Sequence, residues 1–171
     1  MKSRRRDPNG PEPLGPWSEV APRLWMGGHF WVDDVSQSHP AAVAAEFDLV
    51  ISLIDLAGHG PDPGVEHLVA AIPDDALTAG QILAVQNLAT SGAQAMREGR
   101  KVLVRCRQGY NRSGLVVAQI LVELGHETGA AIDLIRKNRS IWALNNEFFV
   151  QYLATGLEVA RLLSELDPPV D

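Results

Sequence analysis

The segment Val102–Gly114 contains the residue types best suited to chemistry in this chain. Its cysteine, Cys106, is followed by Gly109 three positions later, by Arg112 six positions later and by Ser113 seven positions later. An apolar run before the cysteine predicts a buried strand, and a helical pattern follows the arginine. A loop that joins a strand to a helix directs several backbone N–H groups to one point, where the helix dipole adds positive potential. This arrangement is typical of a phosphate site.

Each side chain of this segment has a role if the ligand is a phosphate group. Gly109 allows the loop to curl tightly, because glycine tolerates backbone angles that other residues avoid. The guanidinium of Arg112 can hold two phosphate oxygens in a bidentate fork, which a lysine cannot do. A thiol at the mouth of such a loop lies where the loop attracts anions, and this favours the thiolate. The pattern therefore predicts a phosphate-binding loop with Cys106 as a nucleophile.

The rest of the chain must supply the elements that position this loop. Four strands are expected from apolar or β-branched runs, at residues 22–28, 48–54, 65–71 and 101–105. Five helices are expected from apolar spacing and capping residues, at residues 41–47, 78–98, 112–124, 128–138 and 145–163. Strands that alternate with helices indicate an α/β fold with a central, mostly parallel sheet and helices on both faces.

Composition divides the chain into one domain and two short ends. Residues 1–16 are rich in Pro, Gly and Arg and have almost nothing apolar, which predicts a disordered basic arm. The predicted domain spans residues 17–165, a length that can bury a core of its own. Residues 166–171 are predicted to form a short tail, which contains two prolines.

The charge of the chain is unevenly distributed. The formal net charge of −6 argues against a general nucleic-acid binder, which normally carries a basic surplus. Residues 97–139 nevertheless hold nine basic and four acidic residues, a net charge of +5. A positive segment on an acidic body is what an anion-binding cleft requires. This segment includes Cys106.

Cysteine, histidine and hydropathy patterns exclude several other classes of protein. A single cysteine excludes an intrachain disulfide and a CxxC redox or zinc site. The apolar runs are too short to cross a bilayer and no signal peptide is recognisable, so we expect no membrane partner and a cytoplasmic location. Neither a metal nor a cofactor is expected, because no ligand spacing such as HExxH connects the five histidines, which are His29, His39, His59, His67 and His126.

The pattern from Cys106 to Ser113 resembles the His-Cys-x5-Arg-Ser/Thr signature of the cysteine-dependent protein tyrosine phosphatases. The small dual-specificity subgroup is the closer match. The phrase Leu24–Gly28 is similar to the first strand of that family, and the stretch Arg139–Leu153 resembles its C-terminal helix. The resemblance covers most of residues 17–160 and implies a dual-specificity phosphatase-like catalytic domain.

The resemblance also implies a mechanism and a set of site residues. Cys106 would attack phosphorus as a thiolate and form a phosphocysteine intermediate. The amides of residues 107–112 and the Arg112 guanidinium would hold the phosphoryl oxygens. Ser113 would donate its hydroxyl to the sulfur as the thiolate leaves. The implied substrate-binding residues are Arg107, Gln108, Gly109, Tyr110, Asn111 and Arg112. Of these, Arg107, Gln108, Tyr110 and Asn111 would lie at the rim of the cleft.

A general acid must protonate the leaving oxygen, and the family places an aspartate for this roughly thirty residues before the cysteine. Asp74 lies 32 residues before Cys106, and Asp75 lies 31 residues before it. Either spacing suits the family, whose usual phrase has one residue between an apolar strand end and the acid. The order Ile72-Pro73-Asp74 therefore favours Asp74, with Asp75 as the alternative acid.

One residue departs from the family pattern, since Arg105 stands where the family has a histidine. On an alternating strand this arginine points away from the Cys106 side, toward a position that is normally buried. A buried arginine needs a partner, and we expect a carboxylate of a neighbouring element. As a permanent cation, Arg105 would still support a thiolate, so the expected nucleophile is functional but differently tuned.

The implied substrate is a phosphorylated protein or peptide. The family's compact cores hydrolyse phosphotyrosine and, through a shallow cleft, also phosphoserine and phosphothreonine. Three alternatives remain open: an RNA 5′-triphosphatase, since Gly109-Tyr-Asn-Arg112 resembles that group; a phosphoinositide phosphatase, although the loop has no lysine; and a catalytically idle phosphate-binding module. A rhodanese-like sulfurtransferase is weaker, because its loop is one residue shorter before the arginine.

Overall fold

The computed structural model describes residues 11–166, and a five-stranded sheet lies at its centre. The strand order is β1-β2-β7-β5-β6, in which β1 is antiparallel to β2 and every other neighbouring pair is parallel. This confirms a mostly parallel central sheet. The strands are β1 (Trp17–Ala21), β2 (Leu24–Gly28), β5 (Leu49–Ser52), β6 (Glu66–Val69) and β7 (Val102–Cys106). A separate hairpin pairs β3 (Phe30–Val32) with β4 (Ser38–Pro40).

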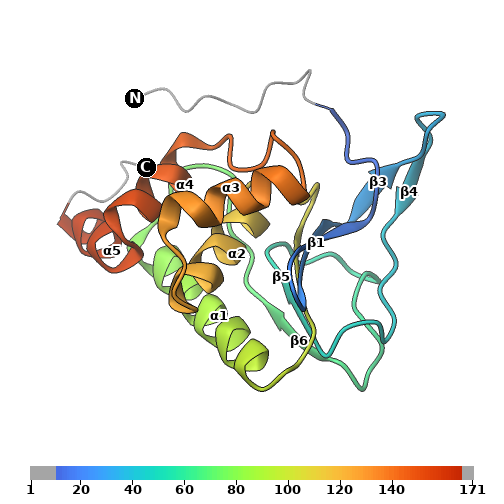
Figure 1. The fold of residues 1–171 in the computed structure, drawn as a ribbon, viewed down its shortest axis with the longest axis horizontal. Helices are drawn as coiled ribbons and strands as arrows, with labels where there is room; N and C mark the ends of the chain where they lie inside the picture. The colour runs from blue at the N-terminus through green and yellow to red at the C-terminus, as the bar shows by residue number, and fades with distance from the viewer. Residues whose placement is uncertain (1–10, 167–171) are drawn as a thin grey trace.

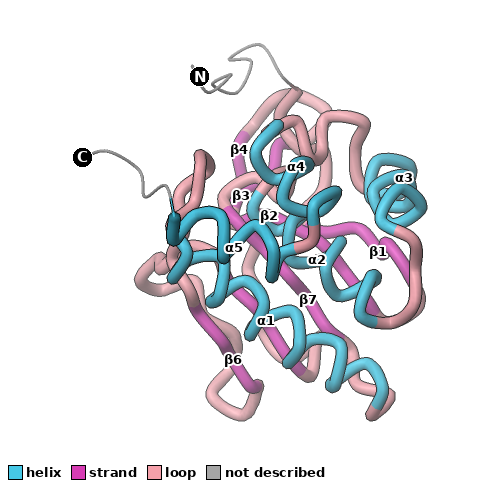
Figure 2. Tube along the Cα trace, turned by 90° about the vertical axis from the view of Figure 1, so that its left-hand side faces the viewer, coloured by secondary structure: helices cyan, strands magenta, loops and turns pink. Residues whose placement is uncertain are grey.

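Five helices flank the sheet, and both views of the chain place them together on one side of it (Figure 1, Figure 2). α1 and α2 run beside each other over the middle of the sheet, α3 packs near β1, and α5 packs on α1. The helices are α1 (Ala79–Arg97), α2 (Arg112–Glu123), α3 (Thr128–Asn138), α4 (Glu147–Thr155) and α5 (Leu157–Leu166). None of these described helices is long and apolar enough to span a membrane.

The expectation of helices on both faces is correct for one face only. Residues 41–47 form an irregular segment with a bend at residues 44–46 instead of the expected helix. Their Val43 and Phe47 side chains cover the second face by packing on Val50 and Leu103. Some of its main-chain groups find partners without a helix, since the amide of Ala44 donates to the Glu46 carboxylate at 2.7 Å and the Ala44 carbonyl accepts the Asp62 amide at 3.0 Å. An irregular segment thus replaces a helical layer.

Helix boundaries follow local capping chemistry. Thr78 and Gln81 form a capping box, in which each side chain accepts a hydrogen bond from the other residue's amide, so α1 begins where the sequence predicted. The helix expected over residues 145–163 is divided into α4 and α5. Gly156, with φ of +94°, ends α4 in a conformation that glycine adopts without strain.

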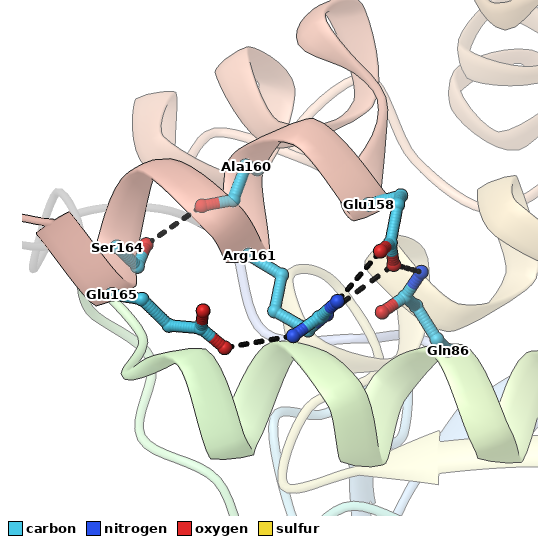
Figure 3. A network of polar contacts seen from close by, with 6 residues as sticks. All are labelled: Gln86, Glu158, Ala160, Arg161, Ser164 and Glu165. Carbon is cyan, nitrogen blue, oxygen red and sulfur yellow. Dashed lines mark hydrogen bonds and ion pairs between the residues drawn. The ribbon is translucent and has the colours of Figure 1, made fainter.

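α5 is held against α1 by buried apolar residues and by a surface network (Figure 3). Arg161 donates to Glu158 and Glu165 on its own helix, and Glu158 accepts a hydrogen bond of 3.2 Å from Gln86 of α1. Exposed pairs of this kind contribute little to stability, because solvent screens them and ordering the side chains costs entropy. The network therefore orients α5, while Leu157 and Ala160 supply the buried contact.

The first described residues pack against the sheet and the hairpin. The amide of Val32 donates to the Pro13 carbonyl at 2.8 Å, and the amide of Gly28 donates to the Pro16 carbonyl at 3.1 Å. Residues 11–16, expected within a disordered arm, are therefore ordered by backbone hydrogen bonds. The remainder of that predicted arm, residues 1–10, and residues 167–171 of the predicted tail lie outside the described residues.

Candidate active site

The central strand β7 places Cys106 at the edge of the sheet where the parallel strands have their carboxyl ends. Its five residues are all buried, and Cys106 is the last of them. Residues 107–111 then form a loop, and α2 begins at Arg112. The neighbouring strand β2 ends at the same level, since Gly28 is in register with Cys106. Ligands of open α/β sheets bind outside the carboxyl ends of the strands, where this loop lies.

The cysteine lies at the bottom of a small cavity. Its side chain is only 3% exposed, and its Sγ atom is 3.3 Å from the Ser113 hydroxyl oxygen. The two residues are therefore within hydrogen-bond distance, as the expected role of Ser113 requires. The cavity is lined by one carboxylate, one thiol and five loop or helix residues: Asp74, Cys106, Arg107, Gln108, Tyr110, Asn111 and Arg112.

The loop is curled tightly and fixed from behind. Gly109 has φ of +76°, and a side chain there would overlap the main chain of Gly27. Arg139 donates to the carbonyls of Gln108 at 2.9 Å and Gly109 at 3.2 Å, and these two bonds fix the loop. A tight loop between a strand and the first turn of a helix suits an anion.

The Arg112 guanidinium is anchored at one side and free at another. One terminal nitrogen donates to the Ile72 carbonyl at 3.3 Å. Its buried Nε has no hydrogen-bond partner among the described residues. A buried N–H is costly when unpaired, so this donor favours an anionic ligand in the cavity.

Asp74 and Asp75 occupy different surroundings. Asp74 lines the cavity, and its carboxylate accepts hydrogen bonds from the amides of Asn111 at 3.0 Å and Asn146 at 2.9 Å. The Asp75 carboxylate instead accepts the adjacent Ala76 amide at 2.8 Å and does not line the cavity. The structure thus brings the first aspartate, and not the second, into the cavity with the cysteine.

The expected rim residues lie in different environments. Arg107 stacks on Phe30 of β3, 5.4 Å from the ring centroid. Gln108 donates to the Glu12 carboxylate at 3.0 Å, and the Tyr110 hydroxyl donates to the Pro11 carbonyl at 2.9 Å.

Sequence reasoning missed three contributions to the site. Nothing in the Pro-rich composition of residues 11–16 signalled that they would contact the loop at residues 107–111. The contacts of Arg139 with the loop and of Asn146 with Asp74 were also missed, although both residues lie in the Arg139–Leu153 stretch that carried the resemblance. That stretch was the available signal.

Arg105 is buried as expected, at 1% exposure, but its partners differ from the expectation. Its Nε donates to the Ser52 hydroxyl at 3.0 Å, and a terminal nitrogen donates to the His59 carbonyl. Among the described residues no carboxylate forms an ion pair with it. Burial alone lowers the pKa of Arg105 to about 10, so the residue remains a cation at neutral pH.

Three histidines surround this arginine behind the loop. The pKa of His29 is lowered to about 3, mainly by burial and next by the charge of Arg105. The same two causes lower the pKa of His67, whose Nε2 lies 2.8 Å from the Ser52 hydroxyl. His29 Nδ1 and His59 Nδ1 are 3.4 Å apart. In the described part of the chain, no group of three or more potential ligands has the geometry for a metal ion.

Comparison with known proteins identifies the fold. No family model matches the chain. Human DUSP28 superimposes with a TM-score of 0.68 at 21% identity, over 88% of this chain and 99% of that one. A mouse putative dual specificity phosphatase complexed with zinc tungstate gives 0.64 at 20% identity, over 96% of each chain. Tk-PTP in the active form gives 0.58 at 22% identity, over 84% and 97%. This chain therefore has the fold of dual-specificity and tyrosine phosphatases, as the resemblance implied.

Proposed function

We propose that this chain is a cysteine-dependent phosphoric monoester hydrolase that acts on phosphorylated proteins or peptides. The observation that carries the proposal is the shared cavity, in which a thiol, a guanidinium and a carboxylate meet at the end of a phosphate-type loop. Nucleophile, anion donor and proton donor are the three groups that transfer of a phosphoryl group to sulfur requires. The fold of the similar phosphatases supports the same activity.

In the first step the Cys106 thiolate attacks phosphorus, and the bond from phosphorus to the leaving oxygen breaks. Asp74 supplies the proton that this oxygen takes up, so that a neutral alcohol or phenol leaves. The amides of the loop and the Arg112 guanidinium stabilise the equatorial oxygens as charge spreads over them. The products of this step are the dephosphorylated residue, a phosphocysteine and an ionised Asp74.

In the second step water attacks the phosphocysteine, and the bond from phosphorus to sulfur breaks. The Asp74 carboxylate accepts a proton from the water and so returns to its acid form. The departing thiolate is stabilised by a hydrogen bond from Ser113, whose hydroxyl oxygen is 3.3 Å from the sulfur. Inorganic phosphate leaves, and the chain is ready for another cycle.

The substrate class follows from the rim and the charge. A cationic loop region on an otherwise acidic body attracts a compact phosphate group more than a long polyanion such as RNA. The loop lacks the lysines that would favour phosphoinositides. The thiolate must also stay reduced to act, which fits the reducing cytoplasm expected for a chain with one cysteine.

Hydrolysis of an aryl phosphate in excess chelator tests the proposal. Cys106→Ser should lower the rate on the order of 10³-fold or more, and rapid acid quench with a radiolabelled substrate should trap phosphate only on chains that keep Cys106. Asp74→Asn should flatten the alkaline limb of the pH profile, on which activity falls as the general acid loses its proton. Asp75→Asn, its neighbour outside the cavity, is the matched control and should leave that limb in place.

Several outcomes would contradict the proposal or assign the chain to another function. Activity that survives Cys106→Ser, or that requires a metal, contradicts the cysteine mechanism. Phosphate binding without turnover indicates an idle binding module. A panel of phosphotyrosine peptide, phosphothreonine peptide, phosphoinositide and triphosphate-ended RNA then identifies the substrate, and preference for either of the last two contradicts the protein-phosphatase assignment.

A further inference from the structure

The side chain of Asn111 joins the phosphate loop to the loop that carries Asp74. Its Nδ2 donates to Asp74 Oδ2 at 3.0 Å and to Asn145 Oδ1 at 2.9 Å, and its Oδ1 accepts the Asn146 amide at 3.1 Å. Both N–H bonds and the carbonyl of this amide group are therefore used inside the protein. The residue is 4% exposed, so it is almost closed to solvent.

The orientation of this amide group is fixed by its neighbours. If nitrogen and oxygen were exchanged, the amide oxygen would face a carboxylate oxygen of Asp74 and the NH₂ group would face the Asn146 backbone N–H. Both contacts would be repulsive, because they would place two acceptors or two donors together. The Asn111 side chain thus has one arrangement that satisfies all its partners, with the N–H directed at Asp74.

A second amide holds the other oxygen of the same carboxylate. Asn146 Nδ2 donates to Asp74 Oδ1 at 2.9 Å, while its own Oδ1 accepts the Phe148 amide as the cap of α4. Each oxygen of Asp74 therefore receives one N–H and keeps a second lone-pair direction for a proton or a leaving oxygen. Two amides from distant parts of the chain fix the plane and the position of the carboxyl group.

We propose that Asn111 is a positioning residue for proton transfer, and not a residue that reads the substrate at the rim. The proposal rests on the proposed function, in which Asp74 is the acid. Asn111 immediately precedes Arg112, so one hydrogen bond connects the loop that grips the phosphoryl oxygens to the group that protonates the leaving oxygen. A displacement of about 1 Å in such a group costs on the order of 10²-fold in rate.

The proposal predicts an effect that depends on the leaving group. Asn111→Leu keeps the size of the side chain and removes its polar atoms, and Asn111→Ser shortens it. Both should lower kcat about 10- to 100-fold on phenyl phosphate, whose strongly basic leaving group needs a proton. Both should lower it less than about 3-fold on 2,4-dinitrophenyl phosphate, whose leaving group departs as an anion and requires little proton transfer.

Two controls separate positioning from general damage. Asn138→Ser is matched in residue type, and among the described residues the Asn138 side-chain amide bonds only to the carbonyls of Val20 and Leu134. This variant should change neither rate. In an Asp74→Asn background, the Asn111 substitutions should add no further loss on phenyl phosphate, because the group that Asn111 positions is already unable to donate its proton.

The outcomes distinguish failure of this inference from failure of the proposed function. Equal losses on both substrates mean that Asn111 merely shapes the phosphate loop, and no loss means that Asn146 alone holds Asp74; either result overturns the positioning role. If Asp74→Asn itself shows no dependence on the leaving group, the assignment of the acid is wrong instead. Thermal unfolding of each variant identifies misfolded chains, and Asn111→Ser replaces Asn111→Leu where the bulkier variant does not fold.

Discussion

Gly109 packs directly against the main chain of Gly27, with no space between them for a Cβ atom. The contact joins the loop at residues 107–111 to the end of β2, and Gly109 also has φ of +76°. The absence of a side chain at Gly109 thus sets how closely the loop approaches the end of β2.

Gly109→Ala should therefore reduce both stability and activity. The left-handed backbone alone costs about 1–2 kcal/mol for alanine, and the overlap with Gly27 pushes the loop away from its curl. We expect a lower denaturation midpoint and weaker inhibition by inorganic phosphate. Gly129→Ala on α3 is the control, because a Cβ atom added there would meet no neighbouring atom within 4 Å. The stability of this variant should rise by up to about 1 kcal/mol. Unchanged phosphate inhibition in Gly109→Ala would show that the loop tolerates a wider curl.

Arg112→Lys should lower kcat/KM on the order of 10²-fold or more, although the charge is kept. Lysine lacks the planar guanidinium and its unpaired Nε. Its single nitrogen therefore does not replace both the bond to the Ile72 carbonyl and a bidentate contact with phosphate. Steady-state kinetics on an aryl phosphate measure the loss. Arg100→Lys, at the opposite end of β7 and paired with Glu66, should leave the kinetics unchanged. Near-normal turnover by Arg112→Lys would mean that point charge, not fork geometry, stabilises the transition state.

Acid should destabilise the fold through His29. The folded protein holds the pKa of this histidine at about 3, whereas in the unfolded chain it returns to 6.5. The unfolded state therefore binds the extra proton first, and stability is lost as pH falls from 6.5 toward 3, by about 2 kcal/mol between pH 7 and pH 5. Urea unfolding at both pH values measures it. His29→Asn should reduce this dependence, and exposed His126→Gln should not; an equal dependence in all three proteins would assign it to other groups.

Arg105→Lys should destabilise the fold by about 1–3 kcal/mol, since lysine lacks the planar guanidinium whose Nε and terminal nitrogen donate to the Ser52 hydroxyl and the His59 carbonyl. Chemical denaturation measures the loss. Combining it with Ser52→Ala should give less than the sum of the two single losses, because both changes break the same hydrogen bond. Full additivity would mean that the bond between Arg105 and Ser52 contributes nothing to stability.

The local features of the site were predictable from the sequence. The spacing of Cys106, Gly109 and Arg112 specifies a curled loop, and the apolar run before it specifies a buried central strand, because both depend on neighbouring residues. The irregular course of residues 41–47 was not predictable, since a short stretch with Val43 and Phe47 suits a helix or an irregular segment equally well. The hydrogen bond from Asn111 to Asp74 joins residues 37 positions apart, and only the folded chain brings them together.

One guanidinium joins the beginning of the described chain to the phosphate loop. Arg139 donates to the Gly15 carbonyl at 3.2 Å as well as to the carbonyls of Gln108 and Gly109. We therefore expect local opening of residues 11–16 to loosen the loop at residues 107–111, and amide hydrogen exchange in that loop should accelerate when residues 11–16 detach. A protease cut near Gly15 should thus change the dynamics of this loop without cleaving it.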